Sequence, residues 1–506
     1  MSPRRPTPLV LAVAAAALGA AAPAHAQPQL IVSRTVYPAG AAAPSITPGQ
    51  TVLPNGALAV GDGRFVNVFK NETVDPSFGV TTGIVIDRRT LAGTILSSYA
   101  PAANGSLVTS FASKSELGLN VSPDGRTVTF MGYAAPASAL DVSNSNTAAV
   151  FDPSNPIPTT YARAVGSFDL ASGAITSTAV NAYSGNNGRA AVLANGNYYL
   201  VGNAGNSSNT PAAIAGTVYS NLSDNTGVQM IAQGASGNTT VVGAVNGTFG
   251  STTGYQRGFS LAQLGAAPDK TGKDDNFRGL TVFNNTLFVT KGSGGNGVNT
   301  VYQVGAAGAL PTLANAGTTP ITVLPGFPTT VGGKGDLSTH PFGLWFGNAT
   351  TLFVADEGDG TRTGGASAGL GEYKLQNGLW AKVNTFTIGL TDQAGYTQGL
   401  PWNVYTDGLR SLTGLANADG SFQLWATTAT TSDDAGHDLG ADPNELVTIT
   451  VNADGSASPF RVLETAAAGE RIGGVAVAAV VPEPGTWGLL LAGLAGTGVL
   501  ARRRRR

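Results

Sequence analysis

Six charged side chains stand shortly before a recurrent phrase, in which glycine or alanine is followed by a short apolar run. They are Glu116, Arg189, Arg278, His340, Arg410 and Arg471. Guanidinium groups bind carboxylates and phosphates, whereas carboxylates and imidazoles act as general acids and bases. If each phrase opens one unit of a repeated fold, these residues ring a single mouth that binds an anion or performs catalysis. The alternative is that the arginines cap carbonyls and pair with neighbouring acids.

Acidic loops are the candidates for a hard cation. Asp356, Glu357 and Asp359 lie in one loop with Gly358 and Gly360, which let the chain curl. Calcium takes six to eight oxygen ligands, and such a loop supplies several. Two further clusters are Asp433-Asp434 with Asp438 and Asp442, and Asp274-Asp275-Asn276. None has the EF-hand spacing. Two interpretations of Asp356, Glu357 and Asp359 therefore remain: a calcium site, or ordinary solvated turns.

Other chemistries find little support in the residues. His340 and His437 are the only histidines after residue 26, which argues against a histidine-based zinc site. No Gly-x-Ser-x-Gly turn supports a Ser-His-Asp triad, and no glycine-rich stretch ends in Gly-Lys-Ser/Thr. The chain has no cysteine, which excludes disulfides, thiolate metal sites and cysteine nucleophiles.

The elements that must position the six charged residues are short strands in a repeated order. Gly279–Val282, the turn Asn284-Asn285 and Leu287–Thr290 form one copy of the pattern, with Thr300–Val304 as a later strand. Asn-Gly, Asp-Gly and Asn-Asn between apolar runs indicate hairpins, because these residues tolerate positive φ. Repeated four-stranded sheets predict an all-β fold, a β-propeller of six or seven blades. A β-helix or a stacked sandwich is the rival architecture.

The repeats exceed the roughly 40 to 50 residues of a bare blade, so long loops must carry the excess. Strands are expected also at Gly63–Phe69 and Thr81–Asp87. Propellers often close by pairing a first strand with the last blade. Leu30–Val36 and Gly474–Ala478 are suited to that closure.

Composition agrees with a strand-rich exported protein. Charged residues are 11% of the chain, against a usual share of about 25%. Removing Arg4, Arg5, Arg502–Arg506 and Glu483 leaves 21 basic and 29 acidic residues, a net charge of −8. A body of this sign is not built to coat nucleic acid.

Residues 1–26 have the features of a secretory signal peptide. Arg4 and Arg5 precede the apolar run Leu9–Ala22, and Ala24-His25-Ala26 fits the small-x-small cleavage pattern. The mature chain is therefore expected to begin at Gln27, and residues 27–480 are expected to form the propeller ectodomain.

The C-terminal tail has the features of a second targeting signal. Val481, Pro482, Glu483 and Pro484 precede the uncharged run Gly485–Ala501, and the chain ends in Arg502, Arg503, Arg504, Arg505 and Arg506. The uncharged run is at the short end for a single transmembrane helix, and the arginines would stay cytoplasmic. These three parts, over residues 481–506, resemble the PEP-CTERM sorting signal of Gram-negative bacteria. The resemblance implies recognition by an exosortase in an organism that makes exopolysaccharide, with an inner-membrane-anchored precursor before processing.

Two functions follow as expectations. The first is a binding or structural propeller in the cell envelope or extracellular matrix, associated with polysaccharide or another surface partner. The alternative is a calcium-dependent propeller hydrolase of the lactonase, phytase or phosphoesterase type, with Glu116, Asp356 or His340 near the metal. Several carboxylates converging on one point would favour the hydrolase, and a mouth lined only by arginines and aromatics would favour binding.

Overall fold

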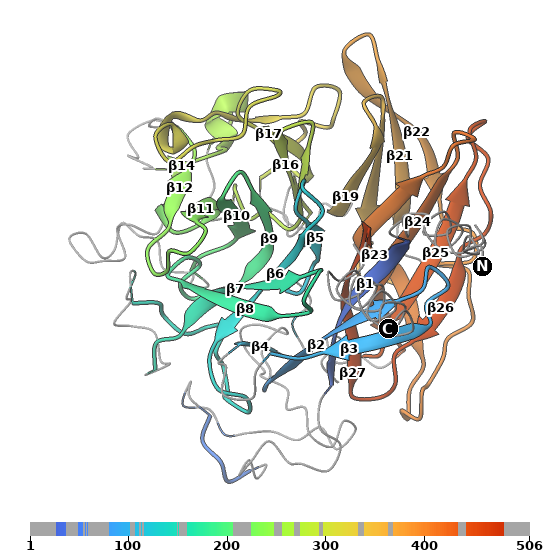
Figure 1. Ribbon diagram of the computed structural model, residues 1–506, viewed down its shortest axis with the longest axis horizontal. Coiled ribbons are helices and arrows are strands. Elements are labelled where there is room, and N and C mark those ends of the chain that lie inside the picture. Colours follow the sequence, from blue (N-terminus) through green and yellow to red (C-terminus); the bar gives the residue numbers. More distant parts are fainter. Residues whose placement is uncertain are drawn as a thin grey trace, which may run out of the picture.

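The fold is that of a computed structural model of the 506-residue chain (Figure 1). The structure describes residues 27–36, 49–53, 80–101, 107–110, 116–148, 159–205, 224–246, 256–267, 274–292, 297–331, 339–362, 368–433 and 442–479, and the single positions 56, 58, 113 and 150. The predicted signal peptide, the strand expected at Gly63–Phe69 and the tail from residue 481 lie outside these residues. Among the described residues, no helix is long and apolar enough to cross a membrane.

Four separate antiparallel sheets each contain four consecutive strands, as expected for the blades of a propeller. Their strands are β9 (Gly188–Ala194), β10 (Asn197–Gly202), β11 (Gly227–Ala232) and β12 (Thr240–Val242); β15 (Leu280–Phe283), β16 (Thr286–Lys291), β17 (Thr300–Val304) and β18 (Ile321–Val323); β19 (Pro341–Asn348), β20 (Thr351–Asp356), β21 (Gly369–Gln376) and β22 (Leu379–Phe386); and β23 (Val404–Ala416), β24 (Phe422–Ser432), β25 (Glu445–Val451) and β26 (Arg461–Thr465). The all-β prediction is confirmed, and the arrangement is propeller-like.

A nine-stranded sheet joins the two ends of the chain. Its strands are β27 (Glu470–Ala479), β1 (Pro28–Val36), β2 (Thr81–Arg89), β3 (Ile95–Tyr99), β4 (Leu107–Ser110), β5 (Asn120–Val121), β6 (Thr127–Ala134), β7 (Ala162–Asp169) and β8 (Ile175–Val180). It contains two four-stranded antiparallel runs, β27-β1-β2-β3 and β5-β6-β7-β8, and β4 links them by pairing with both β2 and β6. β1 pairs with β27 along its whole length, so the predicted closure is confirmed. In Figure 1 the blue strand β1 lies among the orange and red C-terminal strands.

Smaller elements complete the described part of the chain. β13 (Val245–Asn246) pairs with β14 (Gln256–Arg257), and the helices found there are two short 3-10 turns, η3 (Leu261–Leu264) and η4 (Ala316–Thr318). The predicted hairpin turns are present. Asn195 and Gly196 between β9 and β10 have φ of 49° and 73°, and Asn284 and Asn285 between β15 and β16 have φ of 46° and 55°. Positive φ at both central residues matches the twist of the flanking strands.

The first strands of the sheets contact one another in cyclic order: β5, β9, β15, β19, β23, β27 and back to β5. The glycines of the recurrent phrase permit this close approach. A Cβ at Gly279 would overlap the carbonyl oxygen of Phe342 on β19, and one at Gly343 would overlap that of Arg410 on β23. Side chains complete the ring, since Ser411 Oγ accepts a hydrogen bond from Val475 N at 3.0 Å. The repeated glycines therefore serve backbone packing around a common centre.

Apolar side chains fill the spaces between neighbouring sheets. One buried cluster joins Tyr199 and Val201 of β10 to Leu287 and Val289 of β16, and another joins Phe353 of β20 to β23 and β24. This face-to-face packing fixes the rotation of each sheet. It thereby sets the positions of the residues that begin the first strands.

Candidate functional site

An arginine-lined pocket lies where the first strands meet, and we call it the channel mouth. Residues of five first strands line it: Gly118, Leu119, Asn120, Arg189, Ala190, Arg278, Gly279, Leu280, Phe342, Gly343, Leu344, Arg410, Ser411 and Leu412. Three of the six predicted mouth residues, Arg189, Arg278 and Arg410, are therefore brought together. Arg189 lies on β9 and Arg410 on β23, whereas Arg278 lies two residues before β15.

Arg410 and Arg189 are held by hydrogen bonds to neighbouring groups. Arg410 Nε donates to Glu357 Oε2 at 3.0 Å, while its buried Nη1 has no hydrogen-bond partner among the described residues. Arg189 Nη1 donates to the carbonyl of Phe277 at 3.1 Å and to the side chain of Asn276. Only 4% of Arg189 and 6% of Arg410 is exposed, so the charges are recessed. A ligand must insert an anionic group to reach them.

The positive charges of the channel mouth lower the pKa of the Glu357 carboxyl group. Burial acts to raise its pKa, but the charges of Arg410, Arg278 and His340 outweigh burial and hold the pKa below its usual value. Glu357 is therefore ionised and neutralises part of the arginine charge. The lining of the channel mouth itself contains three arginines and no acid, which makes the mouth attractive to an anion.

Asp407, at the beginning of β23, is a second acid of this region and was not predicted. Its Oδ2 accepts from Gly360 N at 2.8 Å, and its Oδ1 has no partner among the described residues. Burial, together with the charges of Glu357 and Asp359, raises its pKa to about 7. Gly358 permits this contact, because its φ is 84° and a Cβ there would overlap Asp407 Oδ1. The signal in the sequence was only a glycine in an acidic loop.

The other three predicted mouth residues lie apart from the pocket lining. Glu116 is buried under β6, where it accepts from Thr109 Oγ1 at 2.7 Å and from the hydroxyl of Tyr133. Burial raises its pKa to about 7 against these hydrogen bonds. The next residue, Leu117, has φ of 68°, an uncommon value for a residue with a side chain.

His340 and Arg471 are also buried. The backbone N–H of His340 donates to Asp356 Oδ2 at 2.8 Å, and its Nδ1 has no partner among the residues described. Arg471 lies on β27 opposite Thr35 of β1. Neither side chain lines the channel mouth.

The acids considered for calcium point to different partners. Asp356 accepts from backbone N–H groups of His340 and Gly358, Glu357 pairs with Arg410, and Asp359 Oδ1 accepts from Thr361. Within the described part of the chain, no group of three or more His, Cys, Asp or Glu residues is placed to hold a metal ion. In this arrangement the acids do not fit calcium, and the calcium site stays a prediction.

The acids of the other two clusters also do not converge on one point. Asp433 accepts from Asn403 N at 2.9 Å and Asp442 from Trp402 Nε1 at 2.9 Å, while Asp434, His437 and Asp438 lie outside the described residues. Asp274 and Asp275 are buried beside each other. Burial and the neighbouring Asp274 raise the pKa of Asp275 well above its usual value.

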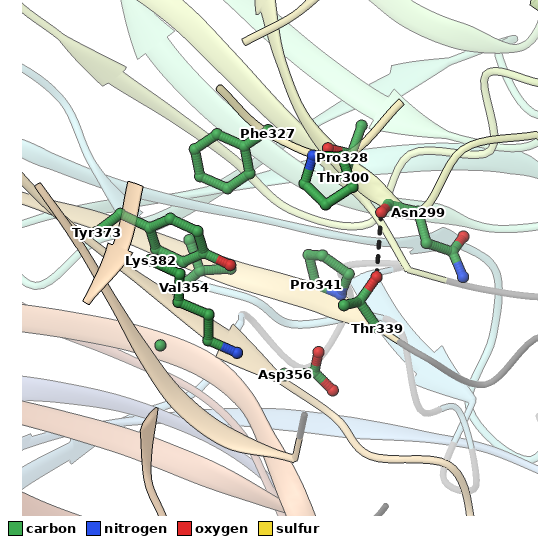
Figure 2. A pocket seen from close by; sticks show the side chains of 11 residues that line it. Asn299, Thr300, Phe327, Pro328, Thr339, Pro341, Val354, Asp356, Tyr373 and Lys382 are labelled. Carbon is green, nitrogen blue, oxygen red and sulfur yellow. Dashed lines mark hydrogen bonds between the residues drawn. The ribbon is translucent and has the colours of Figure 1, made fainter. Parts of the chain in front are cut away.

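A second pocket, not predicted from the sequence, lies between the sheets β15–β18 and β19–β22 (Figure 2). Figure 2 shows Phe327 and Tyr373 on one side, with the amine of Lys382 and the carboxylate of Asp356 directed into the same space. The two rings are stacked, with centroids 4.4 Å apart. Tyr373 and Lys382 are cross-strand partners of β21 and β22, which the turn at Asn377-Gly378 made predictable.

Comparison with known proteins identifies the tail. Residues 480–506 match the PEP-CTERM protein-sorting motif, so the resemblance of the tail is confirmed. The motif implies an exported protein that an exosortase processes, with a membrane-anchored precursor before processing. No curated protein matches the chain.

Several solved structures are similar to the body. The GH74 enzyme of Niastella koreensis is 12% identical, with 75% of this chain and 43% of that chain covered and a TM-score of 0.34. A prolyl endopeptidase is 13% identical, with 77% and 42% covered and a TM-score of 0.28. The acylaminoacyl peptidase of Pyrococcus horikoshii is 8% identical, with 78% and 50% covered and a TM-score of 0.26. The chain thus spans half or less of the length of each, and scores this low say nothing about activity.

Proposed function

We propose that this chain is an exported six-bladed propeller that binds an acidic polysaccharide of the cell envelope or extracellular matrix through its channel mouth. Six blades are supported by the cyclic contacts of the six first strands and by the two four-stranded runs in the nine-stranded sheet. Residues 27–480 form the ectodomain, residues 1–26 the signal peptide, and residues 481–506 the sorting segment with its transmembrane helix.

One observation carries the binding proposal: Arg189, Arg278 and Arg410, from three sheets, line one pocket. Arginine presents a planar fork of donors that matches a carboxylate. Because Arg189 and Arg410 are recessed, and Arg410 Nη1 has no hydrogen-bond partner within the described part of the chain, a single carboxylate on a flexible chain suits the site better than a flat anionic surface. Uronic acid units of an exopolysaccharide present such carboxylates.

The binding proposal is tested with polygalacturonate as the acidic polymer and dextran as the neutral one. The exported protein should bind polygalacturonate, and added salt should weaken binding. Arg278→Gln should weaken it about tenfold or more, since a charged hydrogen bond contributes about 1.5–3 kcal/mol. Arg461→Gln removes an exposed arginine far from the mouth and should leave binding unchanged. Equal binding of dextran, or unchanged affinity in Arg278→Gln, would refute the proposal.

The sorting proposal has its own test in the producing cell. Glu483→Gln and a deletion of Arg502–Arg506 should each change processing of the precursor and the place where the protein accumulates. Immunoblots of membrane, surface and medium fractions measure both. A variant that is processed and located like the wild type would show that these residues are not the signal.

A hydrolase is the second candidate, and the pair Glu357 and Asp407 favours it. The pKa of Glu357 is lowered while that of Asp407 is raised to about 7, and neighbouring carboxyls with separated pKa values are typical of acid–base pairs. Lactones and phosphoesters are the substrates to screen, together with metal analysis of the protein. Turnover of a lactone or phosphoester that is lost in Asp407→Asn would support the hydrolase. If neither substrate class is turned over, the hydrolase hypothesis is ruled out.

A further inference from the structure

We infer that the pocket in Figure 2 is a binding site for one uncharged hexopyranose ring, separate from the channel mouth. Its lining comes from both neighbouring sheets: Asn299, Thr300, Phe327, Pro328, Thr339, Pro341, Val354, Asp356, Gly371, Tyr373 and Lys382. The pocket contains one apolar wall and several polar groups, which is the usual composition of a small-molecule site.

The polar groups of the pocket offer both donors and an acceptor. Thr300 is 1% exposed, and its Oγ1 has no hydrogen-bond partner among the described residues. A buried hydroxyl without a partner costs free energy, so a ligand that bonds to it is stabilised there. Lys382 is exposed, and its amine points toward the carboxylate of Asp356 (Figure 2).

The hydroxyl group of Tyr373 adds another donor. Burial, and then the charge of Asp356, raises the pKa of Tyr373, so the hydroxyl keeps its proton. In Figure 2 this hydroxyl points into the pocket. Asp356 is held in place by the backbone N–H groups of His340 and Gly358, at 2.8 and 3.0 Å.

This combination selects the class of ligand. A phosphate or sulfate would meet the negative charge of Asp356, and a metal ion or amine would meet the positive charge of Lys382. A wholly apolar ligand would leave the hydroxyl of Thr300 buried and unsatisfied. Sugar hydroxyls both donate and accept hydrogen bonds, so neighbouring hydroxyls satisfy a carboxylate and an ammonium together.

The apolar wall fits the flat face of a pyranose. Phe327 stacks on Tyr373 with an angle of 21° between the rings, and Pro328 and Pro341 extend the wall. Gly371 keeps the space beside it open, because a Cβ there would lie 3.0 Å from the Tyr373 ring and 3.4 Å from Lys382 Cε. A side chain at position 371 therefore fills the pocket.

Ligand-observed NMR on the exported protein tests the site, with methyl glucoside, methyl galactoside and N-acetylglucosamine as probes. At least one should show saturation transfer. Lys382→Met and Tyr373→Phe should each weaken its binding about tenfold, since each removes a hydrogen bond to the ring. Gly371→Leu should abolish binding. Thermal unfolding and circular dichroism confirm that each variant is folded, and Tyr373→Phe keeps the aromatic wall if Gly371→Leu fails to fold.

The channel mouth supplies the control that separates the two proposals. Arg278→Gln should weaken polygalacturonate binding and leave hexose binding unchanged, whereas Lys382→Met should do the reverse. The inference fails if none of the three sugars binds, if sulfate or calcium displaces the sugar from the pocket, or if Lys382→Met and Tyr373→Phe bind like the wild type. Loss of hexose binding in Arg278→Gln would also overturn it, since the sugar would then occupy the mouth.

Discussion

Arg410 Nε lies 3.0 Å from Glu357 Oε2, and this ion pair joins β23 to the residue that follows β20. Both side chains are largely buried, with 8% and 17% exposed. The pair fixes the acidic loop against the channel mouth and uses only one edge of the guanidinium. It therefore links the stability of two neighbouring sheets to the charge available for a ligand.

Removing either partner of this pair should destabilise the fold. Arg410→Gln leaves Glu357 buried without its nearest cation, and breaking a buried pair costs about 3–5 kcal/mol. The double variant with Glu357→Gln should lose less than the sum of the two single variants, because no unpaired charge remains. Urea unfolding of the four proteins measures the coupling. Strictly additive losses would mean that the two side chains do not interact.

Stability should depend on pH through Glu116. Its pKa rises from 4.5 to about 7 on folding, so the folded state holds the proton more tightly than the unfolded state. Stability from this group is fully present below about pH 4.5 and is lost as pH rises to about 7, with a loss of about 3 kcal/mol at 1.36 kcal/mol per pKa unit. Glu116→Gln should remove this loss.

Thermal unfolding between pH 4.5 and 8 measures the effect, with Asp454→Asn as an exposed control. Asp407, whose pKa is also raised to about 7, contributes a loss of the same sign that remains in Glu116→Gln. The slope should therefore become shallower rather than vanish. An unchanged slope in Glu116→Gln would contradict the raised pKa.

The recurrent phrase predicted the hairpins, because their turns and glycines are local signals. Three of the six charged residues that precede it, Arg189, Arg278 and Arg410, line one pocket. Glu116 does not line this pocket. It stands two residues before Gly118, whereas Arg278 stands directly before Gly279, and the Glu116 carboxyl group accepts a hydrogen bond from Tyr133 on β6.

Contacts between distant segments could likewise not be predicted from the sequence. Asp407 owes its burial to Gly358 and Gly360, and Phe327 meets Tyr373 only because two sheets pack together. The pairing of β1 with β27 was predictable, since both ends of the ectodomain held unassigned apolar strands. The link that β4 makes between β2 and β6 was not, because β4 is short and lacks a turn signal.

Closure of the ring should depend on Arg34 of β1. Its Nε lies 2.8 Å from Asp87 Oδ2 on β2, and its Nη1 lies 2.6 Å from Glu470 Oε1 on β27. Asp87 is fully buried and keeps Arg89 Nη2 as a partner at 2.7 Å, so Arg34→Met removes one charged hydrogen bond to it and should cost about 1.5–3 kcal/mol. Hydrogen exchange should speed up first at the amides of β1 and β27. Arg126→Met, at an exposed turn, is the control, and equal stability of the two variants would contradict the role of Arg34.

Gly343 and Gly118, which both line the channel mouth, should differ in their tolerance of substitution by alanine. A Cβ at Gly343 would overlap the carbonyl oxygen of Arg410, whereas one at Gly118 would lie 3.9 Å from that of Arg189. Gly343→Ala must push β19 away from β23 and should cost about 1–3 kcal/mol. Gly118→Ala should be neutral or stabilise slightly, by about 0.4–1 kcal/mol, through the unfolded chain.

Both glycines line the same mouth, so anion binding gives a second readout. Gly343→Ala moves the backbone that carries Arg410 and should weaken polygalacturonate binding along with stability. Gly118→Ala should leave both unchanged within error or improve stability alone. Equal losses at the two positions would show that β19 and β23 do not approach as closely as the overlap at Gly343 requires.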